Sequence, residues 1–322
     1  MTATVLLATS FPQSADDAAG HFVRTDAFER AQHGAVHVLT PAAGRVPSVV
    51  EERDPLGSSA KIVVERLPDR GLFGWPGAVA RVRERPLRLF GAATFLRAAT
   101  TALARRPADE TIVAHWALPS ALPAVALGRR MRLVSHGGDI RALCKLPAPL
   151  RTPLLRALLA QTDQWEFVSE TLLASLLDRL SDGDATALRR VARVRPAPLA
   201  PIEAHHRAAG AQLRAAHRQA HGGPLLVSVG RLIPSKRVDA AIRHAARTHG
   251  SLVVVGDGPE AAKLEALAKK TGAAATFLGR VDRGTAVAWI AAADALVFAS
   301  KMEGCSTVLR EAQALGTPVV HV

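Results

Sequence analysis

The sequence has only two cysteines, no tyrosine, and an aromatic content of 4%. Cys144 and Cys305 lie far apart and in no chelating pattern. They predict neither a disulfide framework nor a zinc site, and they indicate a reducing compartment. We recognise no RNA- or DNA-binding motif, and with so few aromatic residues we expect no nucleic-acid partner.

Long apolar runs are also missing. No uninterrupted apolar segment approaches the roughly 20 residues that a membrane-spanning helix requires. The N-terminal run Val5–Ala8 ends before Pro12, and no Lys or Arg precedes Arg24. A signal peptide has a basic start and a longer apolar stretch, so we interpret this run as a buried first strand. The expectation is a soluble, cytoplasmic protein.

The composition otherwise indicates a globular protein. The 322 residues are 48% hydrophobic and 21% charged, which excludes global disorder and suggests about two domains. The formal net charge is +13. Such a charge suits nucleic acid, an anionic membrane face or a phosphorylated small molecule, and by itself it does not choose among them.

Short apolar runs alternate with helical stretches rich in Ala, Arg and Leu. Most are apolar throughout, as in parallel strands that helices cover on both faces, so the pattern predicts an α/β fold. The first series is Val5–Ala8, Val36–Leu39, Ile62–Val64, Ile112–Ala114, Leu133–Ser135 and Glu166–Ser169. The second series is Leu225–Val229, Leu252–Val255, Ala275–Leu278, Ala295–Phe298 and Pro318–Val322.

A proline cluster separates the two series. Residues 195–201 include Pro196, Pro198 and Pro201, and proline cannot donate to a sheet ladder. We therefore expect a hinge near 200, with one Rossmann-like domain at 1–200 and another at 201–322. Sites in such sheets lie outside the carboxyl ends of the strands, and two facing sheets would form a cleft.

Two loops of the second series suit a phosphorylated ligand. Arg231 and Lys236 follow the strand Leu225–Val229, and two cations there would suit a diphosphate. Gly256 and Gly258 follow the next strand and would permit close backbone approach. The alternatives are a solvated loop with two surface cations and a plain β-turn.

The third loop begins a helix. Residues Gly304 to Thr307 are typical of a helix start, where unpaired N–H groups and the helix dipole favour phosphate. Glu303 precedes that helix and Glu311 lies about two turns inside it. One carboxylate would accept hydrogen bonds from sugar hydroxyls and the other from a ribose. The alternative is a capping acid followed by an exposed Glu.

The first series offers two weaker candidates. His136 follows the strand Leu133–Ser135 and precedes two glycines, so its side chain could project into the cleft. Gly20 lies in the loop after the first strand, where its backbone could reach a phosphate. Taken alone, His136 is more simply interpreted as a structural histidine than as a functional one.

In combination, these motifs resemble glycosyltransferase family 4. Order and spacing match across roughly residues 225–320, and the N-terminal half adds weaker matches. The motifs are Gly230-Arg231 with Lys236, Gly256-Asp-Gly-Pro259, Phe277-Leu-Gly279, Glu303 with Glu311, Gly316-Thr-Pro-Val-Val320, and, more weakly, Gly20, His136-Gly-Gly-Asp139 and Val168-Ser-Glu170.

The resemblance implies a retaining, hexosyltransferase-like enzyme of the GT-B fold, with a nucleoside diphosphate sugar as donor and neither a metal nor another cofactor. By the family's pattern Arg231 and Lys236 would neutralise the departing diphosphate. Glu311 would bind the ribose and Glu303 would hold the sugar hydroxyls. His136 would lie beside the anomeric centre. Backbone donors to phosphate would come from Gly20, Gly304, Ser306 and Thr307, and the base would lie near Gly258 and Arg280.

The chain departs from the family's pattern at two points. Members usually continue past the Gly-Thr-Pro-Val-Val strand, whereas this chain ends at Val322, so by that pattern its C-terminal domain is cut short. Arg310 stands where an apolar residue is common. A truncated, non-catalytic sugar-nucleotide-binding protein is therefore the alternative function. A dehydrogenase lacks support because Thr9–Pro12 contains no Gly-x-Gly-x-x-Gly, and the Glu303–Glu311 spacing argues against an epimerase.

The acceptor side is the hardest to interpret. Between Gly71 and Arg106 the sequence holds seven Arg and one acid, interleaved with apolar residues such as Leu87 and Phe90. Our hypothesis from this pattern is peripheral attachment to an anionic membrane face, with a glycan, lipid-linked or small-molecule acceptor. The alternative is a helix pair with its apolar residues in the core. The pair His217 and His221 we interpret as part of a solvated helix face rather than a metal site.

Overall fold

The computed structural model describes residues 3–14, 17, 19–54, 57–221, 223–300 and 305–322. The chain divides into two compact units, which are described separately below. The N-terminal unit comprises Met1–Ala15 and Ala19–Pro198, and the C-terminal unit comprises Asp16–Ala18 and Leu199–Val322. The division falls at the proline-rich segment.

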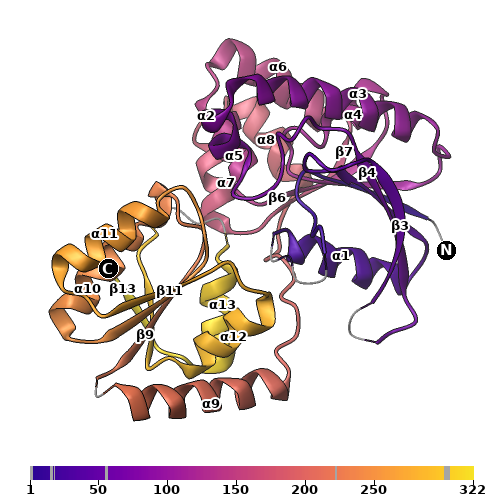
Figure 1. Cartoon of the computed structure of the whole chain (residues 1–322). Coiled ribbons are helices and arrows are strands. Elements are labelled where there is room, and N and C mark those ends of the chain that lie inside the picture. Colours follow the sequence, from indigo (N-terminus) through magenta and orange to yellow (C-terminus); the bar gives the residue numbers. More distant parts are fainter. Residues whose placement is uncertain (1–2, 15–16, 18, 55–56, 222, 301–304) are drawn as a thin grey trace. The chain divides into compact units, whose positions relative to one another are not determined.

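The N-terminal unit is built on one eight-stranded sheet (Figure 1). Its strands are β1 (Thr4–Ala8), β2 (Val36–Pro41), β3 (Ser48–Arg53), β4 (Lys61–Leu67), β5 (Thr111–His115), β6 (Met131–Ser135), β7 (Thr162–Phe167) and β8 (Ala192–Val194). Its helices are α1 (His21–Ala31), α2 (Ala78–Glu84), η1 (Pro86–Leu89), α3 (Phe90–Ala104), α4 (Leu122–Ala126), α5 (Gly138–Lys145), α6 (Ala148–Ala160), α7 (Glu170–Leu177) and α8 (Asp182–Val191).

The sheet has the order β3-β4-β2-β1-β5-β6-β7-β8, and its pairs are parallel except β3 with β4. Each apolar run of the first series overlaps one of the parallel strands. The sequence did not predict β3, because five of its six side chains are exposed and it carries no continuous apolar run. Short β8 was missed as well, since its three residues give no periodic signal.

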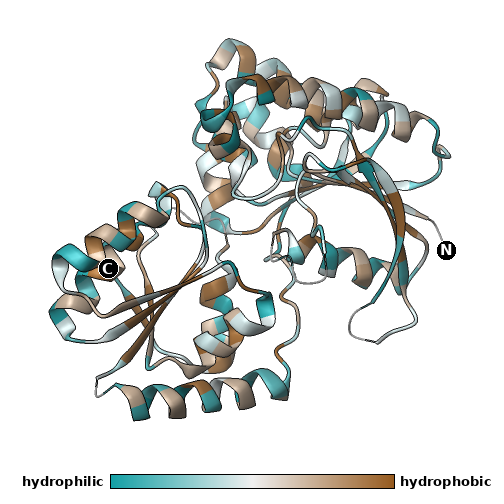
Figure 2. Ribbon diagram, viewed as in Figure 1, coloured by the Kyte–Doolittle hydropathy of each residue, from teal (hydrophilic) through white to brown (hydrophobic). Residues whose placement is uncertain are grey.

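Both faces of this sheet are covered by helices. Helix α1 packs Val23, Ala27 and Phe28 against alternate residues of the central strands, among them Leu6 and Val38. Helix α3 lies on the opposite face (Figure 1). Because both faces are covered, the central strands are apolar throughout, which Figure 2 shows as brown along their length.

The C-terminal unit contains a five-stranded, fully parallel sheet of order β11-β10-β9-β12-β13. Its strands are β9 (Leu225–Val229), β10 (Ser251–Val255), β11 (Ala275–Gly279), β12 (Ala295–Phe298) and β13 (Val319–His321). Its helices are α9 (Ala204–Ala220), η2 (Pro234–Lys236), α10 (Val238–Thr248), α11 (Ala261–Thr271), α12 (Arg283–Ala292) and α13 (Thr307–Leu315). Each apolar run of the second series overlaps one of these strands.

Helix α9 packs along α12, and Gly210 permits this close approach. A Cβ added at Gly210 would lie 2.6 Å from the Cβ of Ala291. The contact buries His206 and His217, so the interpretation of His217 as part of a solvated helix face is wrong. The sequence shows that α9 is polar on average, but which face meets α12 is decided by packing.

Candidate active site

The predicted donor residues of the C-terminal unit lie on loops at one edge of its sheet. Arg231 follows β9, Gly256 follows β10, Arg280 follows β11 and Ser306 lies between β12 and α13. Because the strands are parallel, their carboxyl ends meet at the same edge, which is where ligands bind in such sheets. The donor-binding role of each of these residues remains a prediction.

The glycines after β10 allow the loop after β9 to pack closely on them. A Cβ at Gly256 would lie 2.0 Å from the carbonyl oxygen of Gly230, and one at Gly258 would lie 2.5 Å from that of Leu232. Both glycines have positive φ values, 136° and 158°. The Gly230 N–H donates to the Val255 carbonyl at 2.9 Å. Packing alone thus requires glycine at both positions.

The predicted diphosphate-binding cations lie on this supported loop. Arg231 is partly buried, and Lys236 ends the short helix η2. The Ser300 hydroxyl donates to the Ser235 carbonyl at 3.3 Å, which links the turn to the loop after β12. The turn of Lys236 therefore lies beside the loop that leads toward α13.

Helix α13 begins at Thr307, the last residue of the predicted helix start. Ser306 is the N-cap, and its hydroxyl accepts a hydrogen bond from the Leu309 N–H at 3.4 Å. Among the described residues, the N–H groups of Thr307 and Val308 have no hydrogen-bond acceptor, which suits a phosphate. Glu303 and Gly304 lie outside the described residues.

Glu311 is buried and pairs with a residue that the sequence did not single out. The Arg283 Nε donates to Glu311 Oε1 at 2.9 Å, and only 4% of Glu311 is exposed. The alternative of an exposed Glu is therefore wrong. Burial raises the pKa of Glu311 although the Arg283 charge opposes the shift. The only signal in the sequence that could have pointed to Arg283 is its position, as a cation at the start of α12, shortly after β11.

Arg283 also reaches the segment that follows the division of the chain. It donates to the carbonyls of Ala200 at 2.8 Å and Pro201 at 3.3 Å. One guanidinium thus connects α12, α13 and the start of the C-terminal unit. Arg280 forms an ion pair with Asp17, which belongs to this same unit.

In the N-terminal unit, Gly20 is the N-cap of α1 and has a φ of 76°. A Cβ there would lie 2.6 Å from the carbonyl oxygen of Ser10. Glycine at this position lets the start of α1 lie against the turn after β1. The structure describes this approach, and the predicted phosphate contact of Gly20 stays a prediction.

His136 lies directly after β6, among aromatic rings. Its ring centroid is 4.6 Å from that of Phe22 and 4.8 Å from that of Trp116. Its Nε2 lies 2.9 Å from Nδ1 of His115, and these two rings stack with an interplanar angle of 6°. Burial and the neighbouring His115 hold the pKa of His136 well below its ordinary value, so the ring is neutral at neutral pH.

Behind His136 the contacts continue to an acid. His115 Nε2 lies 3.1 Å from Asp26 Oδ2, and Arg30 Nε donates to the same oxygen at 2.7 Å. Burial alone would raise the pKa of Asp26, but the hydrogen bonds and charges of His115 and Arg30 outweigh it and hold this pKa well below its ordinary value. The sequence did not predict Asp26 or His115, because they lie far apart in the chain and only the fold joins them.

Asp139 fixes the two loops that carry these histidines. Its carboxylate accepts from the Ala117 N–H at 2.8 Å and from the Gly137 N–H at 3.1 Å. Burial raises its pKa, which those hydrogen bonds oppose. The predicted motif His136-Gly-Gly-Asp139 thus contains a residue that clamps the turns beside His115 and His136.

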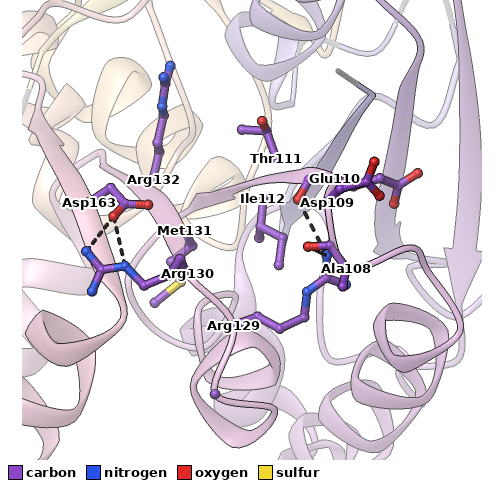
Figure 3. A pocket seen from close by; sticks show the side chains of 11 residues that line it. Ala108, Asp109, Glu110, Thr111, Ile112, Arg129, Arg130, Met131, Arg132 and Asp163 are labelled. Carbon is purple, nitrogen blue, oxygen red and sulfur yellow. Dashed lines mark hydrogen bonds and ion pairs between the residues drawn. The ribbon is translucent and has the colours of Figure 1, made fainter. Parts of the chain in front are cut away.

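A cavity of about 560 Å³ lies at the opposite edge of the same sheet (Figure 3). Its lining includes Thr111 and Met131, the first residues of β5 and β6. Arg129 donates to backbone carbonyls, among them that of Pro107 at 2.6 Å, and Figure 3 shows Arg130 paired with Asp163. These cations are engaged within the protein, so we assign no ligand to this cavity.

Among the described residues, no group of three or more His, Cys, Asp or Glu side chains is arranged to hold a metal ion. In the part of the chain that the structure describes, no helix is long and apolar enough to cross a membrane.

Residues 211–322 match the family model "Glycosyl transferases group 1". The matched residues make up most of the C-terminal unit, which is thus similar to the glycosyl transferases of group 1. This match agrees with the resemblance to glycosyltransferase family 4 that the motifs indicated.

Two curated proteins are similar over part of this chain. One is a GDP-mannose-dependent alpha-mannosyltransferase of Mycolicibacterium smegmatis, 34% identical over 99 residues, or 31% of this chain and 25% of that protein. The other is a GDP-mannose-dependent monoacylated alpha-(1-6)-phosphatidylinositol monomannoside mannosyltransferase of Corynebacterium glutamicum, 32% identical over 109 residues. That match covers 30% of this chain and 29% of the relative. The similarity thus spans between a quarter and a third of each relative.

The fold is similar to that of a sucrose-phosphate synthase of Thermosynechococcus elongatus. The TM-score is 0.69 at 20% identity, with 100% of this chain and 81% of that chain covered. Identity this low shows the fold alone. The chain has the GT-B fold, with two Rossmann-like units, as its two series of apolar runs predicted.

Proposed function

We propose that this protein is a glycosyltransferase that transfers a hexose from a nucleoside diphosphate sugar to an acceptor with retention of configuration. The observation that supports it is the carboxyl edge of the C-terminal sheet, where the loop of Arg231 and Lys236 is hydrogen-bonded to the loop after β12. Negative charge grows on the leaving diphosphate, and fixed cations and N–H groups would stabilise it in the transition state.

The buried pair of Glu311 and Arg283 supports a nucleotide as the leaving group. Arg283 holds Oε1 of Glu311 at 2.9 Å, so the second carboxylate oxygen is available to a ribose hydroxyl. Both curated relatives are GDP-mannose-dependent by name, which makes GDP-mannose our first candidate donor. His136 is assigned to the donor sugar, as the resemblance implies.

For the acceptor we propose a lipid-linked molecule at an anionic membrane surface. Four large apolar side chains, on α2, η1 and the start of α3, are at least 62% exposed; they are Val79, Leu87, Leu89 and Phe90. We name them, together with the exposed Arg83 and Arg85, the α2–α3 patch. Apolar anchors beside cations suit an anionic headgroup layer, where each cation contributes about 1 kcal/mol. The alternative of apolar residues in the core fails for this patch.

The structure narrows the set of cations that can serve such a surface. Arg81 donates to the Phe73 carbonyl at 2.8 Å, and Arg88 donates to Glu84 at 2.7 Å. These two arginines stabilise the local fold, whereas Arg83 and Arg85 are exposed. The membrane proposal therefore depends on Arg83 and Arg85 rather than on all four.

A donor screen tests the enzymatic proposal. The purified protein is incubated with GDP-mannose, UDP-glucose or ADP-glucose and a membrane extract, and release of the nucleoside diphosphate is measured. We expect release from GDP-mannose, undiminished by EDTA, and an α-linked product by NMR. Failure of GDP, UDP and ADP to bind at millimolar concentration would refute the donor site.

Vesicle sedimentation tests the membrane proposal. Binding should rise with the anionic lipid fraction and fall with salt. It should drop for Arg83→Gln/Arg85→Gln and for Phe90→Ser, but not for Arg189→Gln/Arg190→Gln, which changes exposed arginines of α8. Equal binding to neutral and anionic vesicles would contradict the proposal that the α2–α3 patch attaches to an anionic membrane surface.

A further inference from the structure

Arg141 on α5 differs from the other partly buried arginines of the N-terminal unit. Within the described ranges of the chain, its guanidinium forms neither an ion pair nor a hydrogen bond. Every other described arginine of this unit that is at least partly buried pairs with an acid or donates to a carbonyl, as Arg30 does with Asp26 at 2.7 Å. Arg141 is thus a partly desolvated cation without a bonded partner among these residues.

A glycine sets the position of this guanidinium. Side chains of a helix tilt toward its N-terminus, so Arg141 folds back over the first turn of α5. A Cβ added at Gly137 would lie 3.0 Å from Nη1 of Arg141 and 3.5 Å from Cζ. Gly137 has a φ of 114°, which favours glycine, and its N–H donates to Asp139 Oδ1 at 3.1 Å. The guanidinium therefore lies against a fixed turn.

Asp139, the acid nearest to Arg141 in sequence, is used by the backbone. One of its oxygens accepts from the Gly137 N–H, and the other accepts from the Ala117 N–H at 2.8 Å. Only 3% of Asp139 is exposed. Gly138 beside it is exposed, and a Cβ there would meet nothing within 4 Å. An incoming group can therefore reach this turn without displacing a side chain.

The turn lies at the carboxyl edge of the N-terminal sheet. Gly137 follows His136 directly after β6, and ligands of such sheets bind at this edge. A guanidinium that is partly removed from water and has no partner gains most from an anion that accepts hydrogen bonds from its forked N–H groups. The geometry therefore favours an anionic ligand group at Arg141.

We propose that Arg141 binds a phosphate group of the acceptor. Phosphate is the assigned anion because the proposed acceptor is lipid-linked and lies at an anionic lipid surface. The assignment to the acceptor rests on the proposed function, in which Arg231 and Lys236 of the C-terminal unit bind the donor diphosphate. The anion site itself rests only on contacts within the N-terminal unit.

The test is a titration of the full chain, labelled with 15N-arginine, with glycerol 3-phosphate. Glycerol is the uncharged control, and the Nε–H signal of Arg141 is assigned by its loss in Arg141→Gln. We expect a saturable shift of this signal with glycerol 3-phosphate and none with glycerol. The signal of Arg97, an exposed arginine of α3, should show no saturable shift. Without a saturable shift at Arg141 the proposal fails.

Calorimetry measures what the side chain contributes. The affinity for glycerol 3-phosphate should be at least about tenfold lower in Arg141→Gln, because a charge-assisted contact is lost. It should be unchanged in Arg97→Gln, which removes the same charge elsewhere on the unit. Equal losses in the two variants would mean that phosphate responds to net charge alone, which overturns the proposal.

GDP separates the two possible sources of phosphate. GDP should leave the Arg141 signal in place, and its Kd should be the same for wild type and Arg141→Gln. If GDP shifts this signal and binds Arg141→Gln more weakly, Arg141 belongs to the donor diphosphate and the assignment to the acceptor is overturned. If no sugar nucleotide is turned over, the proposed function fails, while the glycerol 3-phosphate titration still decides the anion site.

Thermal stability distinguishes a binding residue from a structural one. Arg141→Gln removes a charge that has no partner among the described residues, so its Tm should equal or exceed that of wild type. Arg151→Gln removes contacts at 2.9 Å to the carbonyls of Leu146 and Arg179 and should have a lower Tm. A Tm that falls as far in Arg141→Gln as in Arg151→Gln would show a structural role and contradict the proposal.

Discussion

Arg283 on α12 and Glu311 on α13 form a buried ion pair, with 2.9 Å between Nε and Oε1. The two residues are separated by 28 positions and come from different strand–helix units. The same guanidinium donates to the carbonyl of Ala200. The carboxylate that the motifs assigned to a ribose is therefore oriented by a cation that the motifs did not include.

We predict that Arg283→Ala weakens nucleotide binding although Arg283 need not touch the nucleotide. Glu311 would lose its orienting partner, a charge-assisted contact worth about 1.5–3 kcal/mol, so the Kd for GDP should rise at least about tenfold. Calorimetry measures this. Glu265→Gln changes an exposed acid of α11 and should leave GDP binding unaltered. An unchanged Kd in Arg283→Ala would refute the assigned role of the pair.

The raised pKa of Glu311 predicts a pH effect of definite sign. Its folded-state pKa exceeds the unfolded value, so the folded protein binds a proton more readily, and stability relative to Glu311→Gln should increase as pH falls from neutral toward the unfolded value. Urea unfolding at several pH values measures this difference. Over the same range GDP affinity should decrease, since the protonated acid accepts hydrogen bonds less well. A wild-type stability that decreases relative to Glu311→Gln on acidification contradicts the assignment.

For the phosphate contact, we predict that Lys236→Ala weakens binding of GDP but not of guanosine. The lysine contributes a point charge toward the diphosphate and nothing to the base or ribose. The loss should be about tenfold or more and should decrease at high salt. Lys269→Ala, on the exposed end of α11, is the matched control. Equal losses for GDP and guanosine would place Lys236 elsewhere in the site.

Gly256→Ala should destabilise the protein far more than Gly272→Ala. Both glycines have positive φ, and at Gly272, in the left-handed helical region with φ 67°, alanine incurs backbone strain of about 1–2 kcal/mol. Gly256, with φ 136°, lies outside that region, where alanine is more strained. Only at Gly256 does the added Cβ also meet backbone, 2.0 Å from the Gly230 oxygen, whereas Gly272 has open space. The difference in unfolding free energy therefore measures the clash together with the greater strain at Gly256. Similar losses at the two sites would mean that the loop after β9 moves freely.

Ionised Asp26 should stabilise the fold above its ordinary pKa of about 3.9. Because its folded pKa is lowered, this stabilisation is present at pH 5 and is lost as pH falls below the unfolded value. The advantage of wild type over Asp26→Asn in urea unfolding should therefore shrink between pH 5 and pH 3. A constant advantage over this range would mean that folding does not lower the pKa of Asp26, and an advantage that grows on acidification would mean that folding raises it.

The sequence predicted local features well where the signal was continuous. Each apolar run overlaps a strand, because a parallel strand buried on both faces must be apolar throughout. Strand β3 escaped, since an exposed edge strand has no such requirement. The glycines at 256 and 258 were recognised as close-approach positions, but the sequence did not show that the approaching group is the loop after β9.

By itself the sequence determined the alternation of strands and helices, the proline-rich segment that divides the chain, the loop that carries Arg231 and Lys236, and the helix that carries Glu311. These follow from periodicity and local residue chemistry, which act over a few positions. Only the tertiary structure decided that Arg283 pairs with Glu311 and that His115 and Asp26 lie behind His136. The reason is physical: a hydrogen bond between residues tens of positions apart exists only once parallel strands have brought their ends to a common edge, and no local pattern encodes that meeting.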